Sequence, residues 1–281
     1  MKKTICALLL TLIALAGCQG KSGLLGDDGN LIVDSVSIDS TAALQAGSAS
    51  PCATLSLSLT FVKPANSTEA ARHAAQNINA CLLSSDLLMP EYADNSARQK
   101  AAQGATSARM SDYLHRYAKR FFKTYRDDCL ELYRDDKENA AFYGRIYRVY
   151  TQMKMGADSI ANYTARILLA NDNDDRTEII WARNFNTHTG ATVLLADVLR
   201  PGYERPLAHM AATELTRRSK AVHDNGDAMA MIPEYVPDNY IISRKGITLI
   251  YNKEDVGAAN ADAACVSLTY KQLEPLLRKK K

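Results

Sequence analysis

The chain lacks the sequence motifs of the common enzyme classes. It has no Gly-x-Ser-x-Gly nucleophile motif, no His-Glu-x-x-His metal motif and no glycine-rich phosphate loop. Its histidines are scattered, and no two have the spacing that would place them on one helix face. Adjacent acids such as Asp127 and Asp128 point apart on a helix. We therefore expect a protein that is not an enzyme and that has no cofactor and no metal site.

A strong net charge and a second long apolar run are also missing. The formal net charge of the whole chain is +3, and it falls to about +1 without Lys2 and Lys3. A near-neutral surface argues against nucleic acid as the partner. Beyond residue 17, no apolar run approaches the roughly 18 residues that a membrane-spanning helix needs. We therefore expect the remaining chain not to span a membrane.

The first 17 residues have the pattern of a lipoprotein signal peptide. Two lysines precede the apolar run Ile5–Ala16, and Leu15-Ala16-Gly17-Cys18 places small residues directly before a cysteine. A signal peptidase would cut before Cys18, whose thiol would carry a diacylglycerol anchor. Residues 18–30 are rich in Gly, Ser and Asp and predict a flexible tether. The sequence thus predicts a cell-envelope protein that is held to a membrane by the lipid on Cys18 and faces the periplasm.

Four cysteines remain after the signal peptide and Cys18, and they predict disulfides in an exported protein. An even number of cysteines outside the cytoplasm favours pairing, and four allow three different pairings. A metal site is the first alternative, but the four are far apart and no histidine lies at ligand spacing. Buried thiols are the second alternative. The candidate disulfide cysteines are Cys52, Cys81, Cys129 and Cys265.

Hydrophobic periodicity predicts strands and helices in separate blocks. Alternation of apolar and polar residues predicts strands, most clearly over residues 53–62. Strands are predicted over residues 31–39, 53–62, 142–155, 160–170 and 177–185, as a pair within 241–251, and over 265–270. Helices are predicted over residues 66–83, with Asn66 as N-cap and Glu69 as its capping-box partner, over 96–134, and over 206–218. Such blocks predict an α+β fold of two small subdomains, with mainly antiparallel sheets packed against helices.

The C-terminal half resembles the RsiV-like family of bacterial domains. The resemblance rests on Asn184-Phe185-Asn186, Thr189-Gly190, Leu194–Leu199, Tyr240–Asn252 and Val266–Tyr270. The family is named for the extracellular part of an anti-sigma factor that binds lysozyme. It often follows a domain like the one attached to PdaC, a peptidoglycan deacetylase.

The resemblance divides the mature chain into two domains. Residues 31–155 resemble the PdaC-type module, and residues 156–281 resemble the RsiV-like domain. Members often carry a Gly-Gly-Ala-His stretch in the hairpin before the Asn-Phe segment, whereas this chain has residues 171–176 there. Neither a deacetylase domain nor a cytoplasmic sigma-binding segment is present, so neither activity is expected.

The resemblance implies a non-enzymatic lipoprotein that binds cell-wall glycan, such as peptidoglycan, or a cell-wall-active protein such as lysozyme. A structural or assembly lipoprotein is the first alternative, and a large exposed apolar patch would favour it. A hydrolase of unfamiliar type is the second, and it would need a pocket with perturbed titratable groups. Its best candidates are His188 with Asp174 or Asp175, which we expect on neighbouring turns. Trp181 could stack on a sugar, although core packing is the commoner role.

Overall fold

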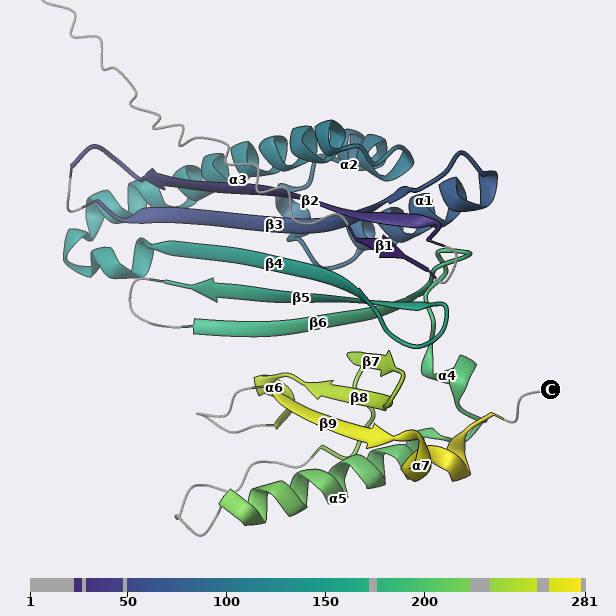
Figure 1. Ribbon diagram of the computed structural model, residues 1–281. Helices are drawn as coiled ribbons and strands as arrows, with labels where there is room; N and C mark the ends of the chain where they lie inside the picture. The colour runs from purple at the N-terminus through teal and green to yellow at the C-terminus, as the bar shows by residue number, and fades with distance from the viewer. Residues whose placement is uncertain are drawn as a thin grey trace, which may run out of the picture.

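The computed structural model describes residues 23–26, 29–47, 50–171, 176–222, 233–256 and 263–278. The predicted signal peptide and Cys18 lie outside these residues. The described part contains a six-stranded sheet and a three-stranded sheet, both packed with helices (Figure 1). Neighbouring strands are antiparallel everywhere except between the third and fourth strands of the larger sheet. The predicted α+β class with mainly antiparallel sheets is therefore confirmed.

The larger sheet follows chain order from β1 to β6. Its strands are β1 (Leu24–Leu25), β2 (Leu31–Ala43), β3 (Cys52–Pro64), β4 (Arg145–Met155), β5 (Ile160–Ala170) and β6 (Arg176–Asn186). The parallel pair β3–β4 requires a long crossover connection, and helices supply it. They are α1 (Glu69–Ser84), η1 (Pro90–Tyr92), α2 (Asn95–Gln103), α3 (Ser107–Asp135) and η2 (Lys137–Tyr143).

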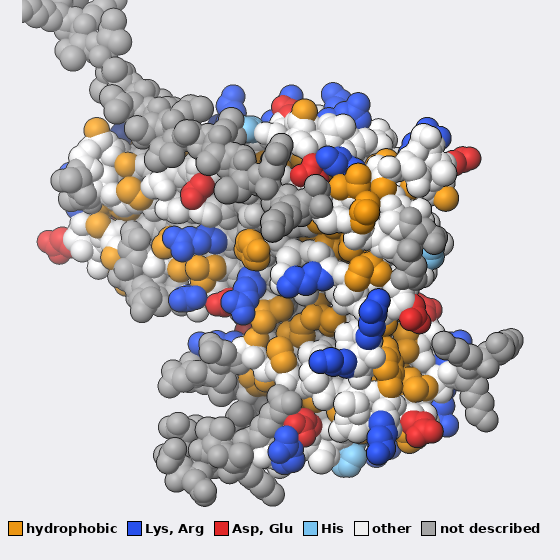
Figure 2. All heavy atoms as spheres, viewed as in Figure 1, with side chains coloured by type: hydrophobic (Ala, Val, Ile, Leu, Met, Phe, Trp, Pro, Cys, Tyr) orange, Lys and Arg blue, Asp and Glu red, His pale blue; other side chains and the backbone are white. Residues whose placement is uncertain are grey.

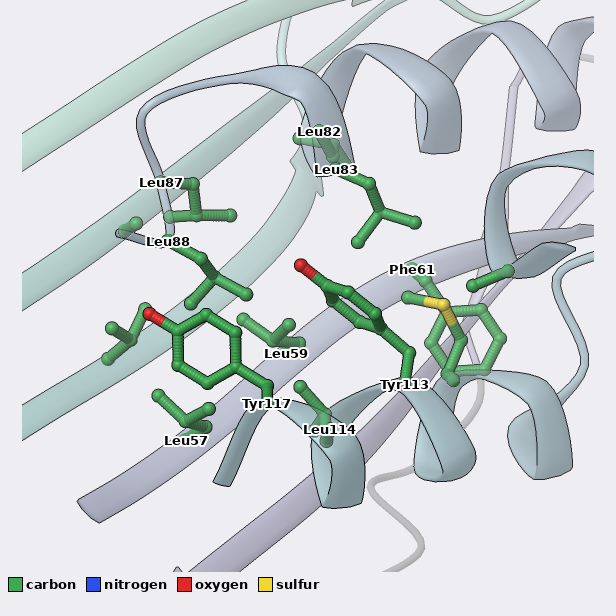
Figure 3. Packing of buried hydrophobic residues seen from close by; sticks show 14 of the residues in the cluster. Leu57, Leu59, Phe61, Leu82, Leu83, Leu87, Leu88, Tyr113, Leu114 and Tyr117 are labelled. Carbon is green, nitrogen blue, oxygen red and sulfur yellow. The ribbon is translucent and has the colours of Figure 1, made fainter. Parts of the chain in front are cut away.

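The crossover helices bury one face of the larger sheet. In β3 the alternate residues Leu55, Leu57 and Leu59 are buried, as the sequence pattern predicted. Figure 3 shows Tyr113 and Tyr117 of α3 reaching in among leucines from β3, from the end of α1 and from the segment after it. The apolar stripe of α3 is thus a core-facing stripe.

Two predicted helix boundaries were wrong. The N-cap of the first helix lies two residues later than predicted, because Thr68 rather than Asn66 accepts the capping hydrogen bond. Asn66 instead accepts hydrogen bonds from the backbone and hydroxyl of Thr68. The predicted helix over residues 96–134 is two helices, broken at Gly104, and Thr106 caps the second. A glycine followed by a capping threonine favours a new helix start over continuation.

The smaller sheet has its own hydrophobic core. Its strands are β7 (Tyr240–Ser243), β8 (Gly246–Tyr251) and β9 (Ala264–Thr269), and its helices are α4 (Leu195–Val198), α5 (Glu204–Val222), α6 (Lys253–Val256), α7 (Tyr270–Leu273) and η4 (Glu274–Leu276). The first core includes Phe185, and the second begins at Leu195. The predicted domain boundary at 155/156 lies between β4 and β5, which pair within one sheet. The two cores divide later, after β6.

Asparagine side chains join the smaller sheet to the edge of β6. Asn252 forms a two-way bridge with Ile180: its Oδ1 accepts from the backbone N–H at 2.8 Å and its Nδ2 donates to the carbonyl at 3.1 Å. Oδ1 of Asn239 accepts from the backbone N–H of Ala182 at 3.1 Å. These contacts satisfy backbone groups that an edge strand would otherwise leave open.

A buried pair, Asn162 and Asn184, continues this junction. Oδ1 of Asn184 accepts from the backbone N–H of Ile242 at 2.9 Å and from Nδ2 of Asn162 at 2.8 Å. Nδ2 of Asn184 donates to the carbonyl of Tyr240 at 2.9 Å, and Nδ2 of Asn162 also donates to the carbonyl of Ile242 at 3.0 Å. The network links β5, β6 and β7, so the two sheets depend on one another.

The stability of the protein should respond differently to removal of the hydroxyl from two buried tyrosines, Tyr117 and Tyr163. The Tyr117 hydroxyl makes no hydrogen bond of acceptable geometry among the described residues, although burial and the nearby Tyr147 hydroxyl raise its pKa. The Tyr163 hydroxyl donates to the carbonyl of Thr60 at 2.9 Å. Tyr163→Phe should lower the free energy of unfolding by about 1.5 kcal/mol, whereas Tyr117→Phe should leave it unchanged or raise it. Urea unfolding measures both, and an equal loss in the two variants would contradict the assignment.

Candidate functional site

The predicted disulfides are not formed. No disulfide joins any of the four candidate cysteines, all of which lie in the described part of the chain. Cys52, Cys81 and Cys129 lie on β3, α1 and α3, and Cys265 lies on the smaller sheet. The first three sulfurs have separate polar neighbours: the Ser50 carbonyl at 3.6 Å, the Thr192 hydroxyl at 3.8 Å and the Arg145 guanidinium at 3.9 Å, respectively. The fold therefore distributes the thiols instead of pairing them.

Trp181, predicted as a candidate ligand contact, lies in the core. Its side chain is 7% exposed, on the face of the larger sheet that includes Tyr163 and Ala165. The Tyr163 ring meets it edge to face at 5.9 Å, and the guanidinium of Arg183 lies 4.8 Å from its ring centre. The structure thus gives this ring a packing role, the alternative considered from the sequence.

His188 lies on the exposed turn after β6. Its Nε2 is 2.9 Å from the hydroxyl of Ser159, and its backbone N–H donates to the side chain of Asn186. Gly190 closes this turn with φ +71°, a conformation that glycine adopts at little cost.

The candidate acids Asp174 and Asp175 lie outside the described residues. His188 follows the end of β6 at Asn186. That His188 and these acids lie on neighbouring turns stays a prediction.

Among the described residues, little packs on the second face of the larger sheet. No described helix packs on it, and in Figure 1 no helix crosses in front of β3–β6. β7 covers the end of this face where Asn162 and Asn184 lie. We call the remainder the open face. Its central residues are Ser37, Ser56, Ser58, Arg148, Tyr150, Gln152, Lys154 and Arg166.

Tyr150 is the aromatic centre of the open face. Its side chain is 58% exposed. It pairs with Ser58 on one neighbouring strand and with Arg166 on the other, and side chains that pair across strands lie about 5 Å apart. Arg148 and Gln152, two residues away along β4, point to the same side. A tyrosine ring therefore lies on the open face of the sheet among hydrogen-bond donors.

Serine and threonine hydroxyls continue this surface over β2 and β3. The hydroxyls of Ser37 and Ser58 are 3.3 Å apart, and Ser56 donates to Asp39 at 3.0 Å. Thr41 and Thr54 pair in the same way at 3.2 Å. These short side chains leave the surface low and polar beside the tyrosine.

The charge on the open face is mainly positive. Among the described residues, no carboxylate lies within ion-pair distance of Arg148 or Lys154. Arg166 is 3.8 Å from Glu178, which binds Arg176 more closely at 3.2 Å. Figure 2, seen from the same side as Figure 1, shows Lys and Arg side chains beside hydrophobic ones where β4–β6 lie.

A small pocket of about 210 Å³ lies on the smaller sheet's side of the junction. It is lined by Tyr235, Asn252 and acidic side chains that include Asp255. The Tyr235 hydroxyl donates to Asp255, and burial together with that carboxylate raises the pKa of Tyr235 to about 12. The pocket is acidic, opposite in sign to the open face.

No described helix is both long and apolar enough to cross a membrane.

Sequence reasoning missed the open face, although a signal for it was present. The predicted strand over residues 142–155 alternates Arg148, Tyr150, Gln152 and Lys154 with Tyr147, Val149 and Thr151. This alternation places the basic and aromatic residues together on the polar side. It does not show that this side stays uncovered, because that depends on where the crossover helices pack.

No protein-family profile and no curated protein sequence matches the chain. Among solved structures, the chain is similar to a DUF3298 family member from Bacteroides fragilis, with 18% identity, 89% of this chain and 94% of that chain covered, and a TM-score of 0.69. A DUF3298 family protein from Pseudomonas aeruginosa is also similar, with 12% identity, 87% and 94% covered, and a TM-score of 0.49. DUF3298 proteins are of the RsiV-like domain type. The first likeness shows that the chain shares their fold.

Proposed function

We propose that this protein is a non-enzymatic lipoprotein of the cell envelope whose open face binds cell-wall glycan. Cys18 would carry the lipid, and the folded part would face the periplasm. The observation that carries the proposal is Tyr150, an exposed aromatic ring on a hydroxyl-rich sheet face. The predicted PdaC-like character of residues 31–155 agrees with a ligand in the cell wall, since β2–β4 belong to that segment.

The surface around Tyr150 has the chemistry that a sugar chain needs. The C–H face of a sugar ring stacks on an aromatic ring, which is apolar on its faces and rigid. The ring's hydroxyls then require polar partners, because a desolvated hydroxyl without a hydrogen bond costs free energy. Polar partners for these hydroxyls lie close to Tyr150. Ser58 and Arg166 pair with it across the neighbouring strands, and Gln152 lies two residues along β4 on the same side.

Replacement of Tyr150 tests the proposal. Tyr150→Ala should weaken binding of the full chain, purified in detergent, to peptidoglycan sacculi about tenfold. Tyr150→Phe should keep most of the affinity because the ring remains. Phe142→Ala is the matched control, since Phe142 is 63% exposed but lies on η2. Co-sedimentation over a range of sacculus concentrations gives the affinities, and unchanged binding by Tyr150→Ala would refute the proposed site.

The assembly-lipoprotein alternative is supported by a different observation. Leu132 and Phe142 are 57% and 63% exposed on α3 and η2, beside the contact between the Tyr133 and Tyr143 rings. Exposed apolar side chains of this kind can mark a protein contact. If sacculi and lysozyme both fail to bind, cross-linking that depends on Phe142 would favour this alternative.

A further inference from the structure

We propose that the glycan recognised by the open face is anionic, with carboxylate or phosphate groups along its length. This inference rests on the proposed function, because it concerns the same surface, and it names the ligand's chemical class. The relevant side chains are Arg148, Lys154 and Arg166, which surround Tyr150 on β4 and β5.

The geometry suits a chain rather than a single ion. Arg148 and Lys154 point to the same side of β4, six residues apart, which corresponds to roughly 20 Å. Tyr150 lies between them, and Arg166 is its partner across the strand pair. A polymer lying along β4 would meet positive charge on both sides of the aromatic ring. An arginine can also hold a carboxylate or phosphate with two parallel hydrogen bonds.

Two cations of the open face, Arg148 and Lys154, differ from the paired cations of α3. On α3, Arg116 is paired with Asp112 at 3.0 Å, and Lys123 is paired with Asp127. Such pairs, one helical turn apart, neutralise part of the helix surface. Arg148 and Lys154 have no such carboxylate among the described residues, so their charge is available to a ligand.

The sign of this charge also separates the two ligand classes that the family resemblance implies. Like charges that face one another across an interface oppose binding. The open face would therefore repel a basic protein, whereas it would attract an acidic wall polymer. The ligand of the open face is therefore a glycan with acidic groups and not a basic protein.

The test compares soluble peptidoglycan fragments that carry free stem-peptide carboxylates with the same fragments after conversion of those carboxylates to methylamides. The full chain in detergent is compared with the triple variant Arg148→Gln, Lys154→Gln, Arg166→Gln. A control triple variant, Arg72→Gln, Lys100→Gln, Lys119→Gln, removes the same charge from exposed positions on α1–α3. Vesicles of phosphatidylglycerol and of neutral phosphatidylcholine, added after removal of the detergent, test a lipid surface as the anion source, because the lipid on Cys18 would insert equally into both.

We expect the open-face triple variant to bind the free-acid fragments about tenfold more weakly, and the control triple variant to bind them like the original protein. Methylamidation should cause a similar loss for the original protein, and added salt should weaken its binding. Equal binding of both fragment types, with a loss in Tyr150→Ala, would overturn the anionic assignment and leave the glycan site intact. No loss in Tyr150→Ala would refute the proposed function itself. Tighter binding to phosphatidylglycerol than to phosphatidylcholine vesicles that is lost in the open-face triple variant, with no binding to fragments, would overturn both.

Discussion

Replacing Asn184 by alanine should lower the free energy of unfolding by about 3 kcal/mol. Asn184 is 1% exposed, and its amide holds the backbone of Tyr240 and Ile242 as well as the side chain of Asn162. Alanine would leave the Ile242 N–H buried without a partner and would remove the partner of the partly buried Tyr240 carbonyl, while Asn162 would keep only its bond to the Ile242 carbonyl. Each buried, unpaired polar group costs roughly 1 kcal/mol or more. The loss of stability should be greatest at the junction between the two sheets, because the asparagine network joins them there.

Urea unfolding followed by Trp181 fluorescence measures this effect, since Trp181 lies on β6 with Asn184. Asn77→Ala is the matched control. Asn77 is exposed and donates a single hydrogen bond to the Thr189 carbonyl at 2.9 Å, so its loss should cost less than about 1 kcal/mol. A cost in Asn184→Ala no larger than in the control would show that the asparagine network does not hold the sheets together.

Local patterns in the sequence predicted most strands of both sheets. The alternation over residues 53–62 recurs in β3, and the predicted strands 160–170 and 177–185 differ from β5 and β6 by one residue at most. These elements could be predicted because side-chain alternation and turn residues act over short stretches of chain.

The pairing of distant segments could not be predicted in the same way. β3 pairs with β4 in parallel across some eighty residues of helical crossover, and no local pattern encodes that register. The predicted strand over 142–155 also starts too early, because residues up to Tyr143 belong to η2. The open face follows from this topology: the helices cover only one side, and Tyr150 remains on the other.

Asp34 shows how tertiary structure resolves a local conflict. It interrupts the alternation of β2 and lies on the helix-covered side of the sheet, opposite Phe61. Lys63 reaches it at 2.6 Å, and Ser107, at the start of α3, donates at 2.9 Å. Burial alone would raise the pKa of Asp34, but these hydrogen bonds together lower it. A charged residue at this position thus requires partners from two other elements, which the sequence does not reveal.

Replacing Gly190 by alanine should destabilise the protein by about 3 kcal/mol. Gly190 has φ +71°, a conformation that costs an alanine roughly 1–2 kcal/mol. An added Cβ would lie 2.3 Å from the carbonyl oxygen of Ala74 on α1. Backbone cannot move aside as a flexible side chain can, so relief of the overlap would cost a further 1 kcal/mol or more. The turn that carries His188 would have to move away from α1.

Gly202→Ala separates the two contributions. Gly202 has φ +79°, but nothing lies within 4 Å of its added Cβ. This variant should therefore show only the conformational cost of about 1–2 kcal/mol, and the difference between the two variants measures the contact with α1. Urea unfolding of both variants gives that difference. If Gly190→Ala costs no more than Gly202→Ala, the turn after β6 does not pack tightly on α1 in solution. In that case the hydrogen bond from Asn77 to this turn would also contribute little to stability, and Asn77→Ala measures that contribution independently.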